Sequence, residues 1–200
     1  MKLKLIEELA SIVAAIVVMI LHEFPKAYVF DRISNKKEEG KKHNIYKIHH
    51  YVDPIGLLFC VASGAGFSRP YMYRIKDKKT NLQLGIVGFI SLLLTFLVSV
   101  SVLRFALGVN QNYYLYSQMS FMEIFAPILM LKMAYMSIGM FLVNLFPLST
   151  SDLGLCVAGN SPSKFMAIIR NDYTLKLVLM LLIIFNIIPV VGELILTQFL

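Results

Sequence analysis

Three ionisable side chains lie within five residues of one otherwise apolar segment: His22, Glu23 and Lys26. Each ionisable group costs about 2–3 kcal/mol or more at bilayer depth, so such residues are candidates for function. The alternative is that the segment ends here and its charges reach an aqueous interface, as the long side chain of Lys26 can do. His22 and Glu23 are too short to do so easily, which favours a functional site.

Residues 22–26 read His-Glu-Phe-Pro-Lys, one residue away from a zinc protease motif. In that motif two histidines four residues apart share a helix face and bind zinc, while the glutamate activates the metal-bound water. Here the second histidine position holds Lys26, whose ammonium has no lone pair for a metal. Pro25 also removes a backbone hydrogen bond to the Leu21 carbonyl, which predicts a bend beside His22.

The composition indicates an all-α integral membrane protein with a single polytopic domain, residues 1–200. Apolar residues make up 58% of the chain, charged residues only 16%, and the mean hydropathy is +0.70. A soluble domain is nearer half apolar and a quarter charged. The net charge is +7, and eleven of the 19 Lys and Arg lie in 31–50 and 67–81. We expect these loops to face anionic lipid, and no nucleic-acid module is visible.

The apolar runs predict about four transmembrane helices plus one re-entrant segment. The expected order is helix 6–31, basic loop 32–53, re-entrant segment 54–67, helix 82–107, helix 121–146, connection 147–173 and helix 174–200. The segment 54–67 is apolar in character but only about 14 residues long, whereas a full span needs about 20. A bend is expected in the last helix near Pro189.

Loop charge predicts the orientation of these elements. If 54–67 crossed the membrane, the two most basic loops would lie on opposite faces, against the positive-inside rule. If it enters and leaves by one face, both loops are cytoplasmic and the segment 108–120, which has no Lys or Arg, is outside. The protein is then a multi-pass membrane protein whose ionisable site lies near the cytoplasmic face.

Several further strings make the chain resemble the site-2 proteases, which are zinc-dependent intramembrane metalloproteases. Where the short family members have His-Ile-Asp-Pro-Ile-Gly, residues 50–56 read His-Tyr-Val-Asp-Pro-Ile-Gly. Where they have Gly-Trp-Ala-Lys-Pro-Val, residues 66–71 read Gly-Phe-Ser-Arg-Pro-Tyr. Their Asn-Leu-x-Pro and Leu-Asp-Gly stretches correspond to Asn-Leu-Phe-Pro at 144–147 and Ser-Asp-Leu-Gly at 151–154. The ordered set covers about 22–155.

The resemblance implies roles for the residues that match these strings. His22 and Asp152 correspond to metal ligands, Glu23 to the general base, and Lys26 to the position of the missing ligand. His50, Asp53, Asn144 and Pro147 correspond to pocket or structural positions. Without the resemblance, Asp152 would be read as a turn or helix-cap residue.

Three departures from the family pattern determine the functional prediction. Lys26 replaces a histidine, residues 88–92 read Gly-Phe-Ile-Ser-Leu without the family's Pro and Asn, and Gly154 comes one place late after Asp152. We therefore expect a pseudoprotease with a site-2-protease-like core and no metal cofactor, which binds or regulates a transmembrane helix of another protein.

Two alternatives stay open at this point. One is an active zinc intramembrane protease with an unusual ligand set, in which His50 joins His22 and Asp152 and Glu23 is the base. The other is a transporter or ion pathway that uses His22, Glu23 and Lys26, although no paired repeat is visible.

Overall fold

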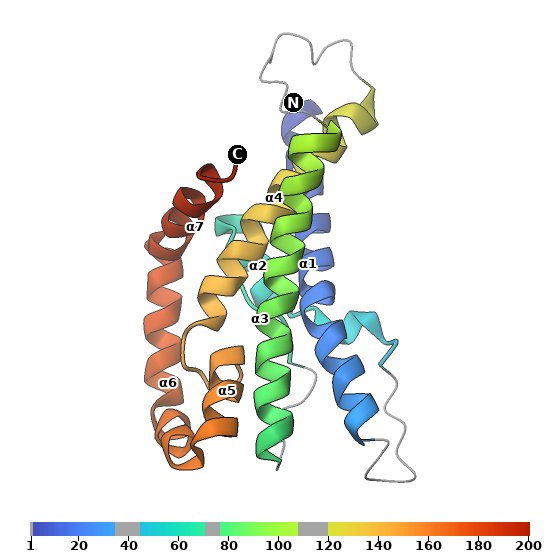
Figure 1. Ribbon diagram of the computed structural model, residues 1–200. Coiled ribbons are helices and arrows are strands. Elements are labelled where there is room, and N and C mark those ends of the chain that lie inside the picture. Colours follow the sequence, from blue (N-terminus) through green and yellow to red (C-terminus); the bar gives the residue numbers. More distant parts are fainter. Residues whose placement is uncertain (1, 35–44, 71–76, 108–119) are drawn as a thin grey trace.

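The computed structural model describes residues 2–34, 45–70, 77–107 and 120–200, which form helices and no strand (Figure 1). In chain order the elements are α1 (Lys2–Ser34), the 3-10 turn η1 (Ile48–Tyr51), α2 (Pro54–Ser63), α3 (Lys78–Ser101), the π-helical turn η2 (Val102–Leu107), α4 (Phe121–Asn144), α5 (Asp152–Asn160), α6 (Pro162–Ile184) and α7 (Ile187–Thr197). Both chain termini lie at the same end of the bundle (Figure 1).

Three helices, α1, α3 and α4, are long and apolar enough to cross a membrane. They pack against one another in every pairing. Their outward faces carry large apolar side chains in the open, such as Leu21 on α1 and Leu94 and Val98 on α3. Exposed apolar surface on this scale is typical of lipid-facing helices. The three helices expected at 6–31, 82–107 and 121–146 are therefore present, with ends that differ by a few residues.

The connection expected at 147–173 is largely helical, which corrects the sequence-based prediction. It contains all of α5 and the first half of α6. Ser151 caps α5 by accepting a hydrogen bond from the Gly154 N–H. Pro162 begins α6, where a proline fits because the first helical N–H has no intrahelical partner. Polar residues in both segments interrupt the long continuous apolar run that predicts a membrane-spanning helix.

The last apolar stretch is a bent pair, α6 and α7, with an angle of 59° between the two helices. If this pair counts as one span, the structure has four. The bend expected near Pro189 occurs at Phe185 and Asn186. A proline clashes with the carbonyl four residues before it, here that of Phe185, so the break precedes the proline. Asn186 absorbs the turn in the left-handed region, with φ of 58°.

The expected re-entrant segment is a short helix followed by an extended return. Asp53 caps α2 by accepting hydrogen bonds from the Ile55 and Gly56 N–H groups, and Gly64 ends it with φ of 78°. The chain then runs back, and the Arg69 N–H donates to the Tyr51 carbonyl over 3.0 Å. Both ends of the segment thus lie together, and ten helical residues span only about 15 Å, half of a bilayer core.

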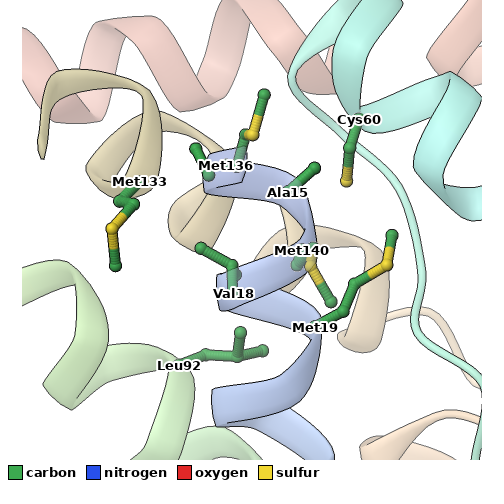
Figure 2. Close-up of a cluster of buried hydrophobic side chains, with 9 residues drawn as sticks. Ala15, Val18, Met19, Cys60, Leu92, Met133, Met136 and Met140 are labelled. Atoms are coloured by element: carbon green, nitrogen blue, oxygen red, sulfur yellow. The ribbon is translucent and has the colours of Figure 1, made fainter. Parts of the chain in front are cut away.

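The core between α1, α2, α3 and α4 is built largely from methionine and small residues (Figure 2). Met19 of α1, Leu92 of α3 and Met140 of α4 are fully buried in it, as is Cys60 of α2. Unbranched methionine side chains fill the irregular space between helices that cross at different angles. This apolar layer lies one helical turn from His22, so the ionisable residues continue a buried helix face.

Parts of the predicted topology fall outside the described residues. These are most of the first basic loop, residues 71–76 of the second, and most of the uncharged segment 108–120. Within the described part, the end of α1, the start of α3 and the start of α6 lie at the end of the bundle opposite the termini (Figure 1). That end carries Arg32, Lys78, Lys79 and Lys164.

Candidate functional site

A closed ring of hydrogen bonds joins five buried side chains from three parts of the chain; we call it the polar ring. Its members are Lys26, Asp152, His22, Ser68 and Glu23, none of them more than 7% exposed. Lys26 Nζ donates to Glu23 Oε1 over 2.7 Å and to Asp152 Oδ1 over 3.0 Å. His22 Nε2 lies 2.7 Å from Asp152 Oδ2, and His22 Nδ1 lies 2.8 Å from Ser68 Oγ. Ser68 Oγ donates to Glu23 Oε1 over 2.7 Å.

Helix α1 supplies three members of the ring because their spacing puts them on one face. His22 and Lys26 are four residues apart, and Glu23 and Lys26 are three apart, so the side chains are neighbours on the helix surface. This face is buried along much of the helix: its buried residues are Ala10, Ser11, Ala14, Ala15, Val18, Met19, His22, Glu23, Lys26 and Ala27. Pro25 lies within the helix without ending it.

Ser68 comes from the extended return after α2, and a close backbone approach holds it there. A side chain on Gly56 would meet the Phe67 carbonyl oxygen at 1.8 Å, so the return can pack against α2 only where that helix has a glycine. This packing brings residue 68 back to the level of His22 and Glu23. The Asp-Pro-Ile-Gly and Gly-Phe-Ser strings are thereby explained as the two halves of one structural unit.

Asp152 reaches the ring from the first turn of α5, and two neighbours fix its position. Its backbone N–H donates to Asn144 Oδ1 over 3.2 Å, while Asn144 Nδ2 donates to the Met140 carbonyl at the end of α4. On the other side, α3 presents Gly88. A Cβ at Gly88 would lie 2.3–2.4 Å from the Asp152 carboxyl atoms, so the carboxylate occupies the space that a side chain would fill.

Counting protons shows that the polar ring is electrically neutral overall. Ser68 has a single hydroxyl proton. If Ser68 donates to Glu23, then His22 donates from both nitrogens and is an imidazolium beside a Glu23 carboxylate. If Ser68 donates to His22 instead, Glu23 carries the proton and both groups are neutral. With the Lys26 ammonium and the Asp152 carboxylate added, the net charge is zero in either arrangement.

Asp152 is held as an anion. Burial alone would raise its pKa, but the charges of Lys26 and His22 and their hydrogen bonds outweigh this and lower the pKa from 3.8 to about 2. The carboxylate therefore stays ionised at any physiological pH. This is consistent with its role as the acceptor for Lys26 Nζ and His22 Nε2 in the ring.

A cavity of about 220 Å³ opens beside the ring. Glu23 and Ser68 line it from the ring side, and Asp53 and Asn144 line it near the ends of α2 and α4. Its other wall is α6, through Lys176, Leu179, Met180 and Ile183. Glu23 is thus the ring member with both a buried ion pair and a face toward open space.

The zinc ion that the resemblance implies does not fit this arrangement. Two ligands of one tetrahedral zinc ion lie about 3.3 Å apart, given bonds of about 2.0–2.1 Å. His22 Nε2 and Asp152 Oδ2 are closer, at 2.7 Å, and share a hydrogen bond. The Lys26 ammonium lies between the two carboxylates. Among the described residues, no group of three His, Cys, Asp or Glu side chains is placed to hold a metal ion.

The structure brings most of the predicted site residues together but not all. His22, Glu23, Lys26 and Asp152 form the ring, Asn144 supports it, and Asp53 caps α2 at the rim of the cavity. Pro147 lies, half-buried, in the turn between α4 and α5.

His50 lies elsewhere: it is exposed in η1, with its ring 4.3 Å from that of His49. Desolvation and the positive charges of His49, Lys47 and Arg69 lower the pKa of His50. Because His50 is exposed, and because no group of three His, Cys, Asp or Glu side chains among the described residues is placed to hold a metal ion, it does not join His22 and Asp152 as a third ligand in this structure.

Two members of the site were missed by sequence reasoning. Ser68 is a serine in a loop-like string, and nothing local marks it as a bridge between His22 and Glu23. Gly88 contributes by having no side chain. The only sign of Ser68 in the sequence is a comparison: the string of the site-2 proteases that this segment resembles has alanine at that position, so the serine adds a hydroxyl group.

Comparison of the chain with protein-family models, with curated proteins and with solved structures found no match.

Proposed function

We propose that this chain is a multi-pass membrane pseudoprotease with a site-2-protease-like scaffold, in which the polar ring takes the place of a zinc centre. The observation that carries the proposal is the Lys26 ammonium, which donates to both Glu23 and Asp152. A zinc dication would neutralise these two carboxylates. Here Lys26 and one proton shared by His22, Ser68 and Glu23 supply the same two positive charges.

The ring is suited to holding structure and poorly suited to hydrolysis. A metalloprotease needs an open metal position with an activated water. In the ring, the nitrogen of His22 that would face a metal is 2.7 Å from Asp152, and Glu23, the candidate base, is paired with a lysine. The proposed role is therefore to bind and hold a transmembrane helix of another protein near the cytoplasmic face, with the cavity beside Glu23 as its contact region.

Two features support a helical partner from the membrane. The cavity is walled by α6, whose outer face exposes large apolar side chains such as Leu177 and Leu181. A helix approaching through lipid meets this surface first. The basic residues gathered at the ends of α1, α3 and α6 support a cytoplasmic location of that end under the positive-inside rule.

Metal content of the purified protein tests the proposal. The parent protein should contain far less than one zinc per chain, and Lys26→His, which restores the histidine spacing, should gain up to one. Lys176→His is the matched control, because it adds a histidine at the far rim of the cavity and should gain none. Stoichiometric zinc in the parent, lost on His22→Ala, would promote the active-protease alternative.

The partner-binding half of the proposal needs a separate measurement. A photo-crosslinking residue at Met180, on the cavity wall, should capture a membrane-embedded partner in cells. The same residue at Val98, on the exposed face of α3, is the control for random lipid-phase encounters. Equal capture at both positions would contradict a specific contact region at the cavity.

A further inference from the structure

A second cavity, of about 300 Å³, lies at the C-terminal end of α2. It is lined by the C-terminal turn of α2, the middle of α4 and the elbow between α6 and α7. Its charged and polar lining comes from Lys132, Tyr135, Asn186 and Glu193, and Val61, Met136, Pro189 and Val190 supply apolar walls. Nothing in the proposed function uses these residues.

Lys132 is placed too deep to reach water at a helix end. It is the twelfth residue of the 24-residue helix α4, so it lies about 16 Å from either end. This exceeds the reach of a lysine side chain, which excludes snorkelling as an explanation. An ionisable residue at mid-span that faces a cavity is a candidate for ligand binding.

The opposite charges that line this cavity are not paired with each other. Neither Lys132 nor Glu193 forms an ion pair or hydrogen bond with any described residue, although both line the same space. Glu193 is exposed and Lys132 is partly exposed, and the described residues give Lys132 no counter-charge. A bound molecule with an anionic group near Lys132 would supply one.

The end of α2 adds a site for the opposite charge. The last carbonyls of a helix have no intrahelical donors and carry the negative end of its dipole. The Ser63 carbonyl accepts from Tyr135 Oη over 3.1 Å, but no described residue donates to the carbonyls of Val61 and Ala62. Val61 and Ala62 line the same cavity as Glu193 and Asn186, so this is the end of the cavity that favours an ammonium group.

We propose that this cavity binds a small zwitterion, with its anionic group on Lys132 and its ammonium between Glu193 and the carbonyl end of α2. The volume is at the lower end of ligand pockets, which limits the ligand to about the size of an amino acid or a lipid headgroup. The apolar walls accommodate a short aliphatic group. A free amino acid and a phosphatidylethanolamine headgroup share this chemistry, so the experiment must separate them.

Equilibrium binding to the parent protein in maltoside micelles is the first test, with radiolabelled leucine and dihexanoylphosphatidylethanolamine as probes. Saturable binding of leucine assigns a free amino acid, and saturable binding of the short lipid alone assigns a headgroup. Isoamylamine and 4-methylpentanoate each lack one charge of leucine. The parent should bind each single-charge analogue about tenfold or more weakly than the preferred zwitterion.

Charge variants give the second test. Lys132→Met and Glu193→Gln should each weaken zwitterion binding about tenfold or more, whereas the control Lys164→Met, at the exposed start of α6, should not change it. Lys132→Met should also lose the preference for the zwitterion over isoamylamine, a selectivity change that general misfolding does not produce. The proposal is overturned if neither probe saturates, or if single-charge analogues bind the parent as tightly as the zwitterion.

Discussion

Replacing Lys26 by methionine tests whether its ammonium holds the polar ring together. Methionine keeps most of the apolar stem and removes the charge, so packing changes little. The variant loses the 2.7 Å hydrogen bond to Glu23 and the 3.0 Å hydrogen bond to Asp152, and it leaves two carboxylates in a buried site. Removing one partner of a buried ion pair costs about 3–5 kcal/mol of unfolding free energy.

Proton uptake by the two carboxylates limits the part of this free-energy cost that comes from their mutual repulsion. It also makes the cost depend on pH. Two carboxylates without their cation repel, and the pair relieves this by binding one proton. For an ordinary carboxyl group with a pKa near 4, that proton costs about 4 kcal/mol at pH 7 and about 1 kcal/mol at pH 5. The folded variant then binds more protons than the unfolded chain, so its deficit relative to the parent should shrink as the pH falls.

Unfolding in mixed maltoside–dodecyl sulfate micelles at pH 7 and pH 5 measures both effects. Lys176→Met is the matched control: Lys176 also pairs with a carboxylate, at 2.5 Å from Asp172, but is 44% exposed. Such an exposed pair contributes about 0–1 kcal/mol. If Lys26→Met costs no more than Lys176→Met at pH 7, or if its deficit is the same at both pH values, the account of the ring is wrong.

Three further predictions follow from the same geometry. The unfolding free energy of the parent should fall between about pH 4 and pH 2, because the pKa of Asp152 is about 2 in the folded chain and 3.8 ordinarily. In an acid-unfolding curve, Asp152→Asn should flatten this part. Gly88→Ala should lower the unfolding free energy by more than about 2 kcal/mol in the same assay, because its Cβ would overlap the Asp152 carboxyl group. The control Gly192→Ala, whose Cβ would have its nearest neighbour at 3.5 Å, should be neutral or stabilising. Single cysteines at Lys47 and Lys78 should react with an impermeant thiol reagent from the same, cytoplasmic, side; labelling from opposite sides would show that the segment between them spans the membrane.

The long helices could be predicted from the sequence because a bilayer demands long apolar runs. That same criterion failed between residues 147 and 173. There α5 is only nine residues long, and the first turns of α6 carry Ser163, Lys164 and Arg170 among the apolar positions. The position of Pro189 alone did not give the position of the bend before α7. A proline disturbs the carbonyl four residues before it, so the helix breaks upstream of the proline.

The candidate site, too, could be predicted only in part from the sequence. His22, Glu23 and Lys26 could be found from one helix, since their cost at bilayer depth marks them. Asp152 is 126 residues from Lys26 in sequence, and only the resemblance indicated that they meet. Local patterns carry no information on such a distance. Nor could they show that His50, six residues before Gly56 in a matching string, would be exposed in η1 and not a member of the polar ring.

If the chain shares the site-2 protease scaffold, as we propose, Lys26 and Ser68 must be considered together. A zinc centre with two neutral histidines and two carboxylates is neutral, and replacing one histidine and the metal by a single lysine leaves one positive charge missing. A proton on the His22–Glu23 pair supplies it, and that proton needs a group that both accepts from histidine and donates to carboxylate. A hydroxyl does this, whereas the alanine of the family string cannot. Under the proposed relation to the site-2 proteases, Lys26 and Ser68 are therefore two parts of one change: the lysine replaces half of the metal's charge, and the serine holds the proton that replaces the other half.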